Sequence, residues 1–355
     1  MLRLLPGQPL PVARSPYESQ VIQFCQQWLA GQKTVTLSTS GSTGKPKPIE
    51  LSRNQLTASA RMTGATFGLL PGDHAFCGLN VAYIAGIMML VRALELGLSL
   101  TVVEPSAYPL KGIDPQEKLD FAAFVPLQLQ TMLEQHVGAI AILDRMKAIL
   151  VGGATLSGAL EKVLQRLTAP VFSTYGMTET VSHVAIRRLN GAERTENYQL
   201  LGGVEAGSDH RSCLWVRGAM TDFNVVQTND VVAWTSARSF EWRGRYDNII
   251  NSGGVKVQPE RVELAVEIAL RDVGFTGRFF VTGLAEERLG QQVALVLEGS
   301  PLMPTQQVRA DELLREHVPA YELPRRWIAV THFVETPTGK VDKRRTLEKW
   351  SEAAD

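Results

Sequence analysis

Residues 38–47 read Ser38-Thr39-Ser40-Gly41-Ser42-Thr43-Gly44-Lys45-Pro46-Lys47 and follow one short apolar strand at 35–37. Glycines let a backbone approach an anion closely, hydroxyls are neutral donors, and lysines supply positive charge. This combination predicts a loop that holds the phosphates of a nucleotide. A flexible linker rich in serine and glycine is the alternative that the stretch alone leaves open.

The stretch differs from the Walker loop, which has four residues between its glycines and then Gly-Lys-Ser/Thr. Here two residues separate Gly41 from Gly44, and Pro46 directly follows Lys45. Proline pushes the residue before it toward extended geometry, so we expect no helix to begin at Lys45. The pattern therefore predicts a phosphate loop of another kind.

The composition is typical of a soluble globular protein, with 355 residues, 45% hydrophobic and 20% charged. Lysine plus arginine equals aspartate plus glutamate at 36 each, so no overall field favours nucleic acid or an anionic membrane. Three scattered cysteines form no CxxC pair, which indicates buried filler in a reducing compartment and neither zinc nor disulfides. The longest apolar run, 84–91, falls short of the ~20 residues of a membrane span. We expect a cytoplasmic protein of two domains.

Hydrophobic periodicity predicts alternating helices and strands along the first half of the chain. A helix over 17–29 precedes the strand at 35–37, and Ser52 with Gln55 forms a capping box that opens a helix through about Phe67. Further strands are expected at 75–79, 100–103, 121–125, 148–151 and 171–174, and helices at 85–96, 127–135 and 158–167. This alternation predicts an α/β fold with parallel strands and helices on both faces, whose ligands sit beyond the carboxyl ends of the strands. The loops at 38–47, 152–154 and 174–179 each follow an expected strand.

The pattern changes after Gly191 to shorter β-like pieces at 214–216 and 231–234. A second unit begins near Asp247, so we expect a large domain over 1–246 and a small α+β domain over 247–355. The expected elements of the small domain are a turn at 251–254, helices at 259–270 and 308–317, and strands at 279–281, 293–297 and 327–333.

Four more segments follow the loop in order: Tyr175-Gly176-Met177-Thr178-Glu179, Thr228-Asn229-Asp230, Gly244-Arg245-Tyr246-Asp247 and Pro337-Thr338-Gly339-Lys340. Together with the loop they resemble the adenylate-forming superfamily of acyl-CoA synthetases, luciferases and peptide-synthetase adenylation domains. The resemblance runs from about Val35 to Arg345. It implies a large N-terminal domain with parallel sheets and flanking helices, shortened at its front end, and a small mobile C-terminal domain.

The resemblance also implies the reaction, in which a carboxylate attacks the α-phosphorus of ATP and displaces pyrophosphate. Lys340 would bridge the attacking carboxylate and the α-phosphate, and Thr178 and Glu179 would meet the phosphates and a Mg²⁺ ion. The other nucleotide contacts that it implies are Thr39, Ser40, Gly41, Ser42, Thr43, Gly44 and Lys45 on the phosphates, Gly152, Gly153, Ala154, Thr174, Tyr175 and Gly176 around the adenine, and Asp230 and Arg245 on the ribose.

Plainer roles stay open for several of these side chains. Lys340 lies near other basic residues and could belong to a solvated tail. Tyr175 could be a core aromatic, Glu179 a solvated carboxylate, and Asp230 with Arg245 an exposed ion pair.

Asp247 aligns with the hinge of the superfamily. The resemblance implies that the small domain rotates there after adenylation, withdraws Lys340 and opens a channel for the thiol of coenzyme A. No covalent enzyme intermediate is expected.

A narrower resemblance concerns the acid. The shortened front end, residues 80–92, and the sequence YGMTETVSHVAIRRLN at 175–190 resemble the short bacterial o-succinylbenzoate-CoA ligases of menaquinone biosynthesis. This acid has two carboxylates, so one must stay bound by a cation or donors while the other reacts. Sequence does not rank the candidate cations Arg92, Arg61 and Arg187. The implied acyl-pocket residues are Tyr83, Gly86, Arg92, Ser182 and His183.

Other functions stay open at this point. The chain could load another fatty or aryl acid onto coenzyme A or a carrier protein, or it could be a non-catalytic nucleotide-binding paralogue. The implied partners are small molecules, with no nucleic acid and no membrane span, and a homodimer is left open.

Overall fold

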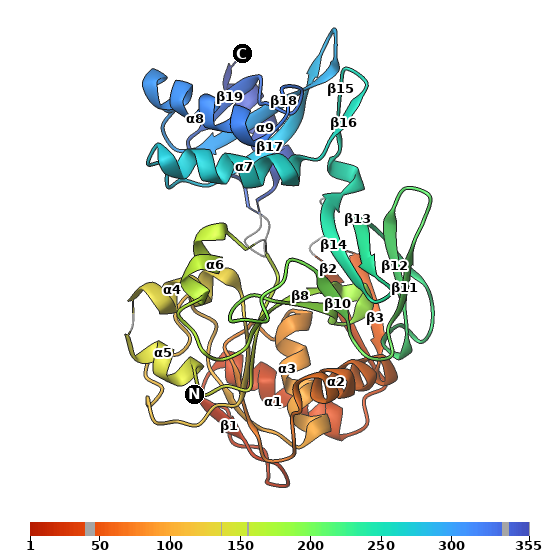
Figure 1. Cartoon of the computed structure of the whole chain (residues 1–355). Coiled ribbons are helices and arrows are strands. Elements are labelled where there is room, and N and C mark those ends of the chain that lie inside the picture. Colours follow the sequence, from red (N-terminus) through yellow and green to blue (C-terminus); the bar gives the residue numbers. More distant parts are fainter. Residues whose placement is uncertain (40–46, 136, 155, 336–340, 355) are drawn as a thin grey trace.

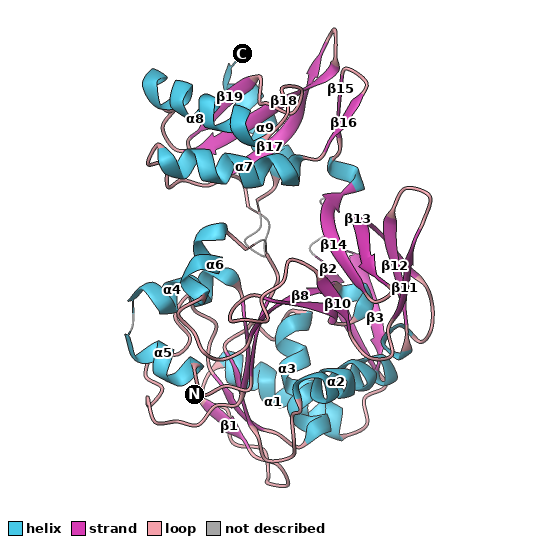
Figure 2. Cartoon of the chain, in the orientation of Figure 1, coloured by secondary structure: helices cyan, strands magenta, loops and turns pink. Residues whose placement is uncertain are grey.

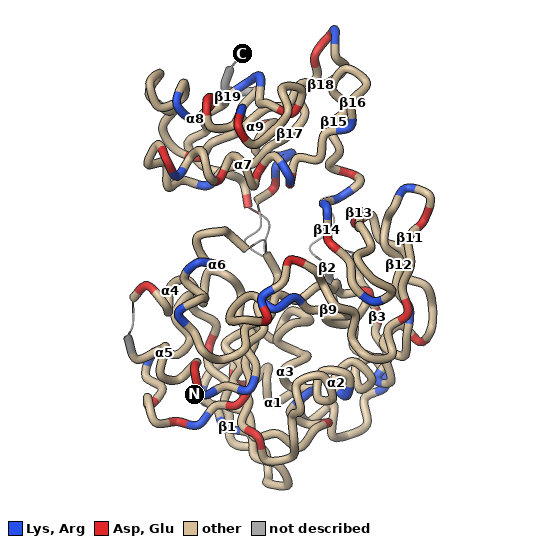
Figure 3. The backbone as a smooth tube through the Cα atoms, viewed as in Figure 1, with Lys and Arg blue, Asp and Glu red and all other residues tan. Residues whose placement is uncertain are grey.

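The computed structural model describes residues 1–39, 47–135, 137–154, 156–335 and 341–354, which form two lobes (Figure 1). The larger lobe is built on a 12-stranded sheet and the smaller on a five-stranded sheet. The chain passes between the two sheets once, between β14 (Ser239–Arg245) and β15 (Ile250–Ser252). Figure 3 shows basic and acidic residues intermixed over both lobes, in keeping with the zero net charge.

Five parallel strands form the centre of the large sheet, which confirms the α/β fold expected from the alternating pattern. Their order in space is β5 (Ser99–Val102), β4 (His74–Cys77), β6 (Phe121–Phe124), β7 (Ala148–Val151) and β8 (Val171–Gly176). Antiparallel strands extend this centre at both sides: β1 (Leu2–Leu4) pairs with β5, and beyond β8 follow β9 (His183–Arg188), β10 (Tyr198–Leu200), β14, β13 (Val226–Ser236), β12 (Cys213–Arg217) and β11 (Glu205–Ser208).

Neighbouring residues of the parallel strands face opposite sides and supply two separate cores. Phe76 and Val151 pack with α4 (Pro126–Gln135), α5 (Val137–Leu143) and α6 (Gly158–Leu164), whereas Cys77 and Leu150 pack with α1 (Pro16–Leu29) and α3 (Ile84–Leu96). Helices therefore cover both faces of the sheet, as Figure 2 shows. All three cysteines are buried and free, in agreement with their expected role as filler.

The strand at 35–37 lies outside the parallel sheet. It belongs to β2 (Thr34–Thr39), whose one partner among the described strands is β3 (Lys47–Ser52), in a two-stranded antiparallel sheet, so the expected phosphate loop connects two strands of a hairpin. Of residues 34–37, the alternate residues Val35 and Leu37 are buried, against α2 (Arg53–Phe67) and its neighbours. A strand buried on one face suits a hairpin, because central parallel strands are apolar on both faces. The prediction that the strand before the loop belongs to the parallel sheet was therefore wrong.

Local signals predicted the start and end of α2 correctly. Ser52 Oγ accepts a hydrogen bond from Gln55 N at 3.1 Å, and Gln55 Oε1 accepts one from Ser52 N at 2.8 Å, which completes the capping box. The helix ends at Gly68, whose φ of 59° is left-handed. In contrast, α6 ends at Leu164, three residues earlier than expected, and β1, α5 and β9 were not predicted.

The small lobe has its own sheet and its own two cores. Strands β16 (Val255–Val257), β15, β18 (Gly290–Glu298) and β17 (Phe279–Glu286) lie in this order, and β19 (Arg326–Val330) pairs with β18. Helices α7 (Pro259–Asp272) and α8 (Pro304–His317) pack on one face, and α9 (Lys343–Ala354), where a basic tail had been the alternative, packs on the other. Among the described residues, no helix combines the length and apolar character needed to cross a membrane.

Candidate active site

Strands β8, β13 and β14 bring together three residues implied to bind the adenosine. Tyr175 Oη donates a hydrogen bond to Asp230 Oδ2 at 2.7 Å, and Arg245 Nη1 lies 3.8 Å from Asp230 Oδ1. Asp230 and Arg245 are direct partners in the β13–β14 register, so the sheet itself sets their spacing. Trp242 Nε1 also donates to Asp230 Oδ1 at 3.2 Å.

Asp230 is buried, and its surroundings keep Tyr175 neutral. Burial raises the pKa of Tyr175, and the charge of Asp230 raises it further. The Tyr175 ring packs edge-on against Phe240 and Tyr198, with centroids 5.5 and 5.9 Å away. These contacts match a core aromatic, and stacking of Tyr175 on adenine stays a prediction.

Arg245 links this network to the chain segment between the lobes. Its Nη2 lies 2.7 Å from Asp247 Oδ2, and Asn229 Nδ2 donates to Asp247 Oδ1 at 2.8 Å. Burial lowers the pKa of Arg245, but the hydrogen bond that it donates to Asp247 and the charge of Asp230 outweigh this effect and raise it. Asp247 lies in the short helix η3 (Tyr246–Asn248), in the single passage between the two sheets.

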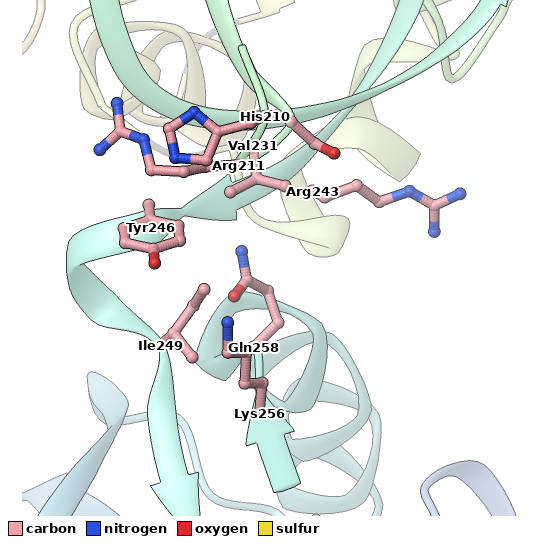
Figure 4. Close-up of a pocket in the computed structure, with 9 residues that line it drawn as sticks. His210, Arg211, Val231, Arg243, Tyr246, Ile249, Lys256 and Gln258 are labelled. Atoms are coloured by element: carbon pink, nitrogen blue, oxygen red, sulfur yellow. The ribbon is translucent and has the colours of Figure 1, made fainter. Parts of the chain in front are cut away.

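A cavity of about 480 Å³ lies at this junction, lined by residues of both lobes (Figure 4). Val231 lines it, whereas its neighbour Asp230 points to the opposite face of β13, so the cavity is separate from the Tyr175–Asp230 network. The Tyr246 ring has Arg211 of the large lobe 5.1 Å and Lys256 of the small lobe 5.8 Å from its centroid. One ring thus contacts a cation from each lobe.

The expected adenine loop follows β7, next to the end of β8. Thr174 Oγ1 donates to Val151 O at 3.2 Å, and a Cβ atom added to Gly152 would lie 2.3 Å from Thr174 Oγ1. Any larger residue would force Thr174 Oγ1 to move, so the local packing favours glycine at this position. Gly153 and Ala154 are exposed beyond it.

The turn after β8 sends consecutive side chains in different directions. Glu179 lies in the short helix η1 (Thr178–Thr180), is exposed, and forms no ion pair with any residue that the structure describes. Val181 then takes a left-handed φ of 65°, unusual for a β-branched residue, and Ser182 and His183 follow with largely buried side chains. This turn therefore separates the implied phosphate side from the implied acyl side.

Arg92 is a buried cation on α3, only 2% exposed. Its Nη2 donates to Ser182 Oγ at 2.7 Å and its Nε to Thr63 Oγ1 at 3.2 Å, both neutral acceptors. Burial lowers the pKa of Arg92 to about 10. Within the described residues no carboxylate pairs with it, so the guanidinium is left without a counter-charge.

His183 lies beside Arg92 and shares its hydroxyl partners. Its Nε2 is 3.4 Å from Thr63 Oγ1 and its Nδ1 is 3.3 Å from Ser182 Oγ. Burial, and then the charge of Arg92, lower the pKa of His183 well below its usual value. The imidazole is therefore neutral and can both donate and accept one hydrogen bond.

The other candidate cations have different surroundings. Arg187 Nη2 lies 2.5 Å from Glu161 Oε1, and Arg187 also pairs with Glu196, so its charge is already matched. Arg61 is exposed on α2. The structure thus favours Arg92 over Arg187 and Arg61 as the buried cation without a counter-charge among the described residues, a choice that the sequence left open.

Two further acyl-pocket candidates lie at the start of α3. Tyr83 immediately precedes the helix and is 37% exposed. A Cβ atom on Gly86 would lie 2.4 Å from Asn80 O, so this glycine lets the first turn pack on the preceding loop. Met88 and Met89 are fully buried core residues, as expected.

Several residues of the implied site fall outside the part of the chain that the structure describes. They are Ser40, Gly41, Ser42, Thr43, Gly44, Lys45 and Lys340, and their implied roles stay predictions. Of Thr39, the structure gives the backbone pairing with Lys47.

Sequence reasoning missed Thr63 and Trp242. Thr63 was detectable, because it is a polar residue on the buried face of α2, in line with Leu56, Ala60 and Gly64. Trp242 gave no such signal, since its contact with Asp230 depends on the β13–β14 register.

Comparisons with known proteins agree with this geometry. A family model described as AMP-binding enzyme matches residues 23–207. The solved structure of an acyl-CoA synthetase (AMP-forming)/AMP-acid ligase II-like protein from Dyadobacter fermentans is 43% identical, covers 95% of each chain, and has a TM-score of 0.64. A probable 2-succinylbenzoate–CoA ligase of Mycobacterium tuberculosis is 28% identical over 90% of this chain and 85% of its own. The o-succinylbenzoate CoA synthetase of Bacillus subtilis, solved with its acyl-adenylate intermediate, has a TM-score of 0.74 at 18% identity over 87% of this chain and 68% of its own, a likeness of fold.

Proposed function

The chain belongs to the AMP-binding enzyme family, and we propose that this AMP-forming acyl-CoA ligase activates o-succinylbenzoate in menaquinone biosynthesis. ATP and the acid would form an acyl-adenylate with release of pyrophosphate, and coenzyme A would then take the acyl group. Curated relatives named 2-succinylbenzoate–CoA ligase, at 24% and 28% identity, support this choice of acid.

Arg92 is the observation that carries the proposal. A buried charge without a partner is unfavourable, so a site that keeps one is suited to a ligand that brings the opposite charge. An acid with two carboxylates can place one against Arg92 while the other reacts. Ser182 and Thr63 hold the guanidinium in place, and neutral His183 contacts both of these hydroxyls.

The nucleotide half of the site is assigned by resemblance and by the contacts of its described residues. Asp230 and Arg245 would bind the ribose hydroxyls, and the loop at 39–45 would hold the phosphates. Lys340 would bridge the attacking carboxylate and the α-phosphate, and the small lobe would rotate at Asp247 before the thiol attacks.

The residues present fit one Mg²⁺ ion. Glu179 is an exposed carboxylate without an ion-pair partner among the described residues, and Mg²⁺ usually takes one or two carboxylates together with substrate phosphates. The described residues contain no group of three acidic, histidine or cysteine side chains that would form a separate protein cage. Bound there, the ion would neutralise charge on the phosphates.

Pyrophosphate exchange into ATP with a panel of acids tests the proposal. We expect exchange with o-succinylbenzoate, followed by thioester formation with coenzyme A, and much weaker exchange with 4-oxo-4-phenylbutanoate, which keeps only one carboxylate. Preference for a monocarboxylic acid would overturn the choice of substrate. If ATP binds and no acid supports exchange, the chain is a nucleotide-binding paralogue.

The assignment of Lys340 has its own test. Lys340→Ala should lower pyrophosphate exchange by on the order of a hundredfold or more, because one preorganised charge at the reacting phosphate is lost. It should still convert supplied acyl-adenylate and coenzyme A to the thioester. An equal loss of both half-reactions would contradict the assigned role.

A further inference from the structure

The carboxylate of Glu267, on helix α7 of the small lobe, contacts helix α6 of the large lobe. Its Oε2 accepts a hydrogen bond from Gly158 N at 3.1 Å, and its Oε1 lies 3.4 Å from Ala159 N. Both amides belong to the first turn of α6, which lies opposite α7 in Figure 1. The Glu267 side chain is 21% exposed, so the contact is partly shielded from water.

The first turn of α6 obtains its hydrogen-bond acceptors from two different lobes. The first N–H groups of any helix have no partner within the helix. Ser157 Oγ accepts from Leu160 N at 3.1 Å, as an N-cap residue should. Gly158 N and Ala159 N are left for Glu267, whose negative charge also suits a helix N-terminus. Arg271 Nη2 holds Glu267 Oε1 at 2.8 Å and fixes the carboxylate in this position.

The contact lies close to the implied nucleotide site. Gly158 follows the loop Gly152-Gly153-Ala154 by four residues, so α6 and that loop are one short continuous segment. Seven residues before Glu267, on the same face of α7, Glu260 Oε1 accepts from Asn248 Nδ2 at 2.6 Å beside the passage between the lobes. Helix α7 is thus attached at both ends, by the passage at its start and by α6 near its end.

We propose that Glu267 is a positioning residue that fastens the small lobe to α6 in the orientation used for adenylation. The inference rests on the proposed function, because only an enzyme with two half-reactions needs to make and release this contact. A contact next to the nucleotide loop serves the step in which the small lobe closes on ATP. It must break when the lobe rotates for thioester formation.

The two half-reactions measured separately test the proposal on the full chain. Glu267→Ala and Glu267→Gln should slow pyrophosphate exchange about fivefold to tenfold, since hydrogen bonds to a charged group are lost. Conversion of supplied o-succinylbenzoyl-adenylate and coenzyme A to the thioester should stay within about twofold of wild type or rise. Asp272→Asn is the matched control, because it removes an α7 carboxylate whose partner, Arg309, lies in the small lobe. Unchanged exchange, or equal losses in both half-reactions, would overturn the proposal.

Amide hydrogen exchange tests the contact without any substrate. Gly158 and Ala159 should exchange more slowly in wild type and in Asp272→Asn than in either Glu267 variant. Equal exchange in all four proteins would show that the contact does not form in solution and would overturn the proposal. If wild type activates no acid while these amides are protected by Glu267, the proposed function fails and the contact stands.

Discussion

Asp230 and Arg92 are both buried charged residues, but their surroundings differ. Asp230 is surrounded by Tyr175, Trp242 and Arg245, so its negative charge is matched inside the protein. Among the residues that the structure describes, Arg92 has only the neutral oxygens of Ser182 and Thr63 and the sulfur of Met89 as partners. A matched charge is ready to orient neutral hydroxyls, whereas an unmatched one is ready for an anion. The difference explains why we assign the ribose to the first region and the second carboxylate to the other.

Removing the charge of Arg92 gives the largest expected effect. Arg92→Met should lower kcat/KM for o-succinylbenzoate by roughly a hundredfold or more, because the buried partner of a substrate carboxylate is lost. The same change should leave the melting temperature unchanged or higher, since an unpaired buried cation is removed. Steady-state kinetics and thermal unfolding measure both values.

Arg187→Met is the matched control for this prediction. Arg187 is equally an arginine near the site, but it is paired with Glu161 and Glu196. Its replacement should lower the melting temperature and leave the preference for a dicarboxylic acid intact. The same response from both variants would contradict the distinction between unpaired Arg92 and paired Arg187.

A change at Asp230 should have a smaller and different effect. Asp230→Asn weakens the charged contact with Arg245 and the hydrogen bonds from Tyr175 and Trp242, so KM for ATP should rise about tenfold. KM for the acid should stay unchanged, because Arg92 lies in the other region. Initial rates at varied ATP and varied acid separate the two constants, and a rise in the constant for the acid alone would contradict the assignment.

The pH dependence of stability should reveal the uncharged state of His183. Its pKa in the folded protein is lowered, first by burial and then by Arg92, while the unfolded chain titrates near pH 6.5. The folded protein therefore binds fewer protons, so its free energy of unfolding should fall as the pH drops below about 6.5, by at most ~1.4 kcal/mol per pH unit. In His183→Gln this part of the fall should disappear in urea titrations at pH 5.5 and 7.5.

The smallest effect is expected at Glu260, a partly buried carboxylate where no ligand is proposed. Burial raises its pKa, and its Oε2 has no hydrogen-bond partner among the described residues. The folded protein thus holds this proton more tightly, and stability is lost as the pH rises through the raised pKa. Glu260→Gln should therefore raise the free energy of unfolding at pH 8 by about a few tenths of a kcal/mol and not at pH 4. A destabilised variant at pH 8 would show that the carboxylate charge is needed.

Much of the architecture was predictable because it depends on local signals. Ser52 and Gln55 cap α2, Gly68 ends it, and the apolar strands alternate with helices as the parallel sheet requires. The partner of β2 was not predictable, since pairing depends on residues beyond the loop and not on the strand itself. Helix α9 was missed because the basic run at 343–345 hides the apolar residues Leu347 and Trp350, which pack on the sheet.

The residue types of the site were predictable from the sequence, but the choice among the candidate arginines was not. Motif residues such as Tyr175, Asp230 and Arg245 were named from sequence, and the structure brings these three together. The choice of Arg92 over Arg187 depended on Glu161 and Glu196, which neutralise Arg187 from other parts of the chain. Such pairings are three-dimensional, and residue spacing does not encode them.

The single passage between β14 and β15 has a practical consequence. Both cores of the small lobe draw only on residues from Ile250 onward, so cutting the polypeptide near Asn248 would sever one peptide bond and divide no core. The two lobes could then be produced as separate chains and mixed. The activity recovered as one lobe is titrated with the other would measure the affinity between them.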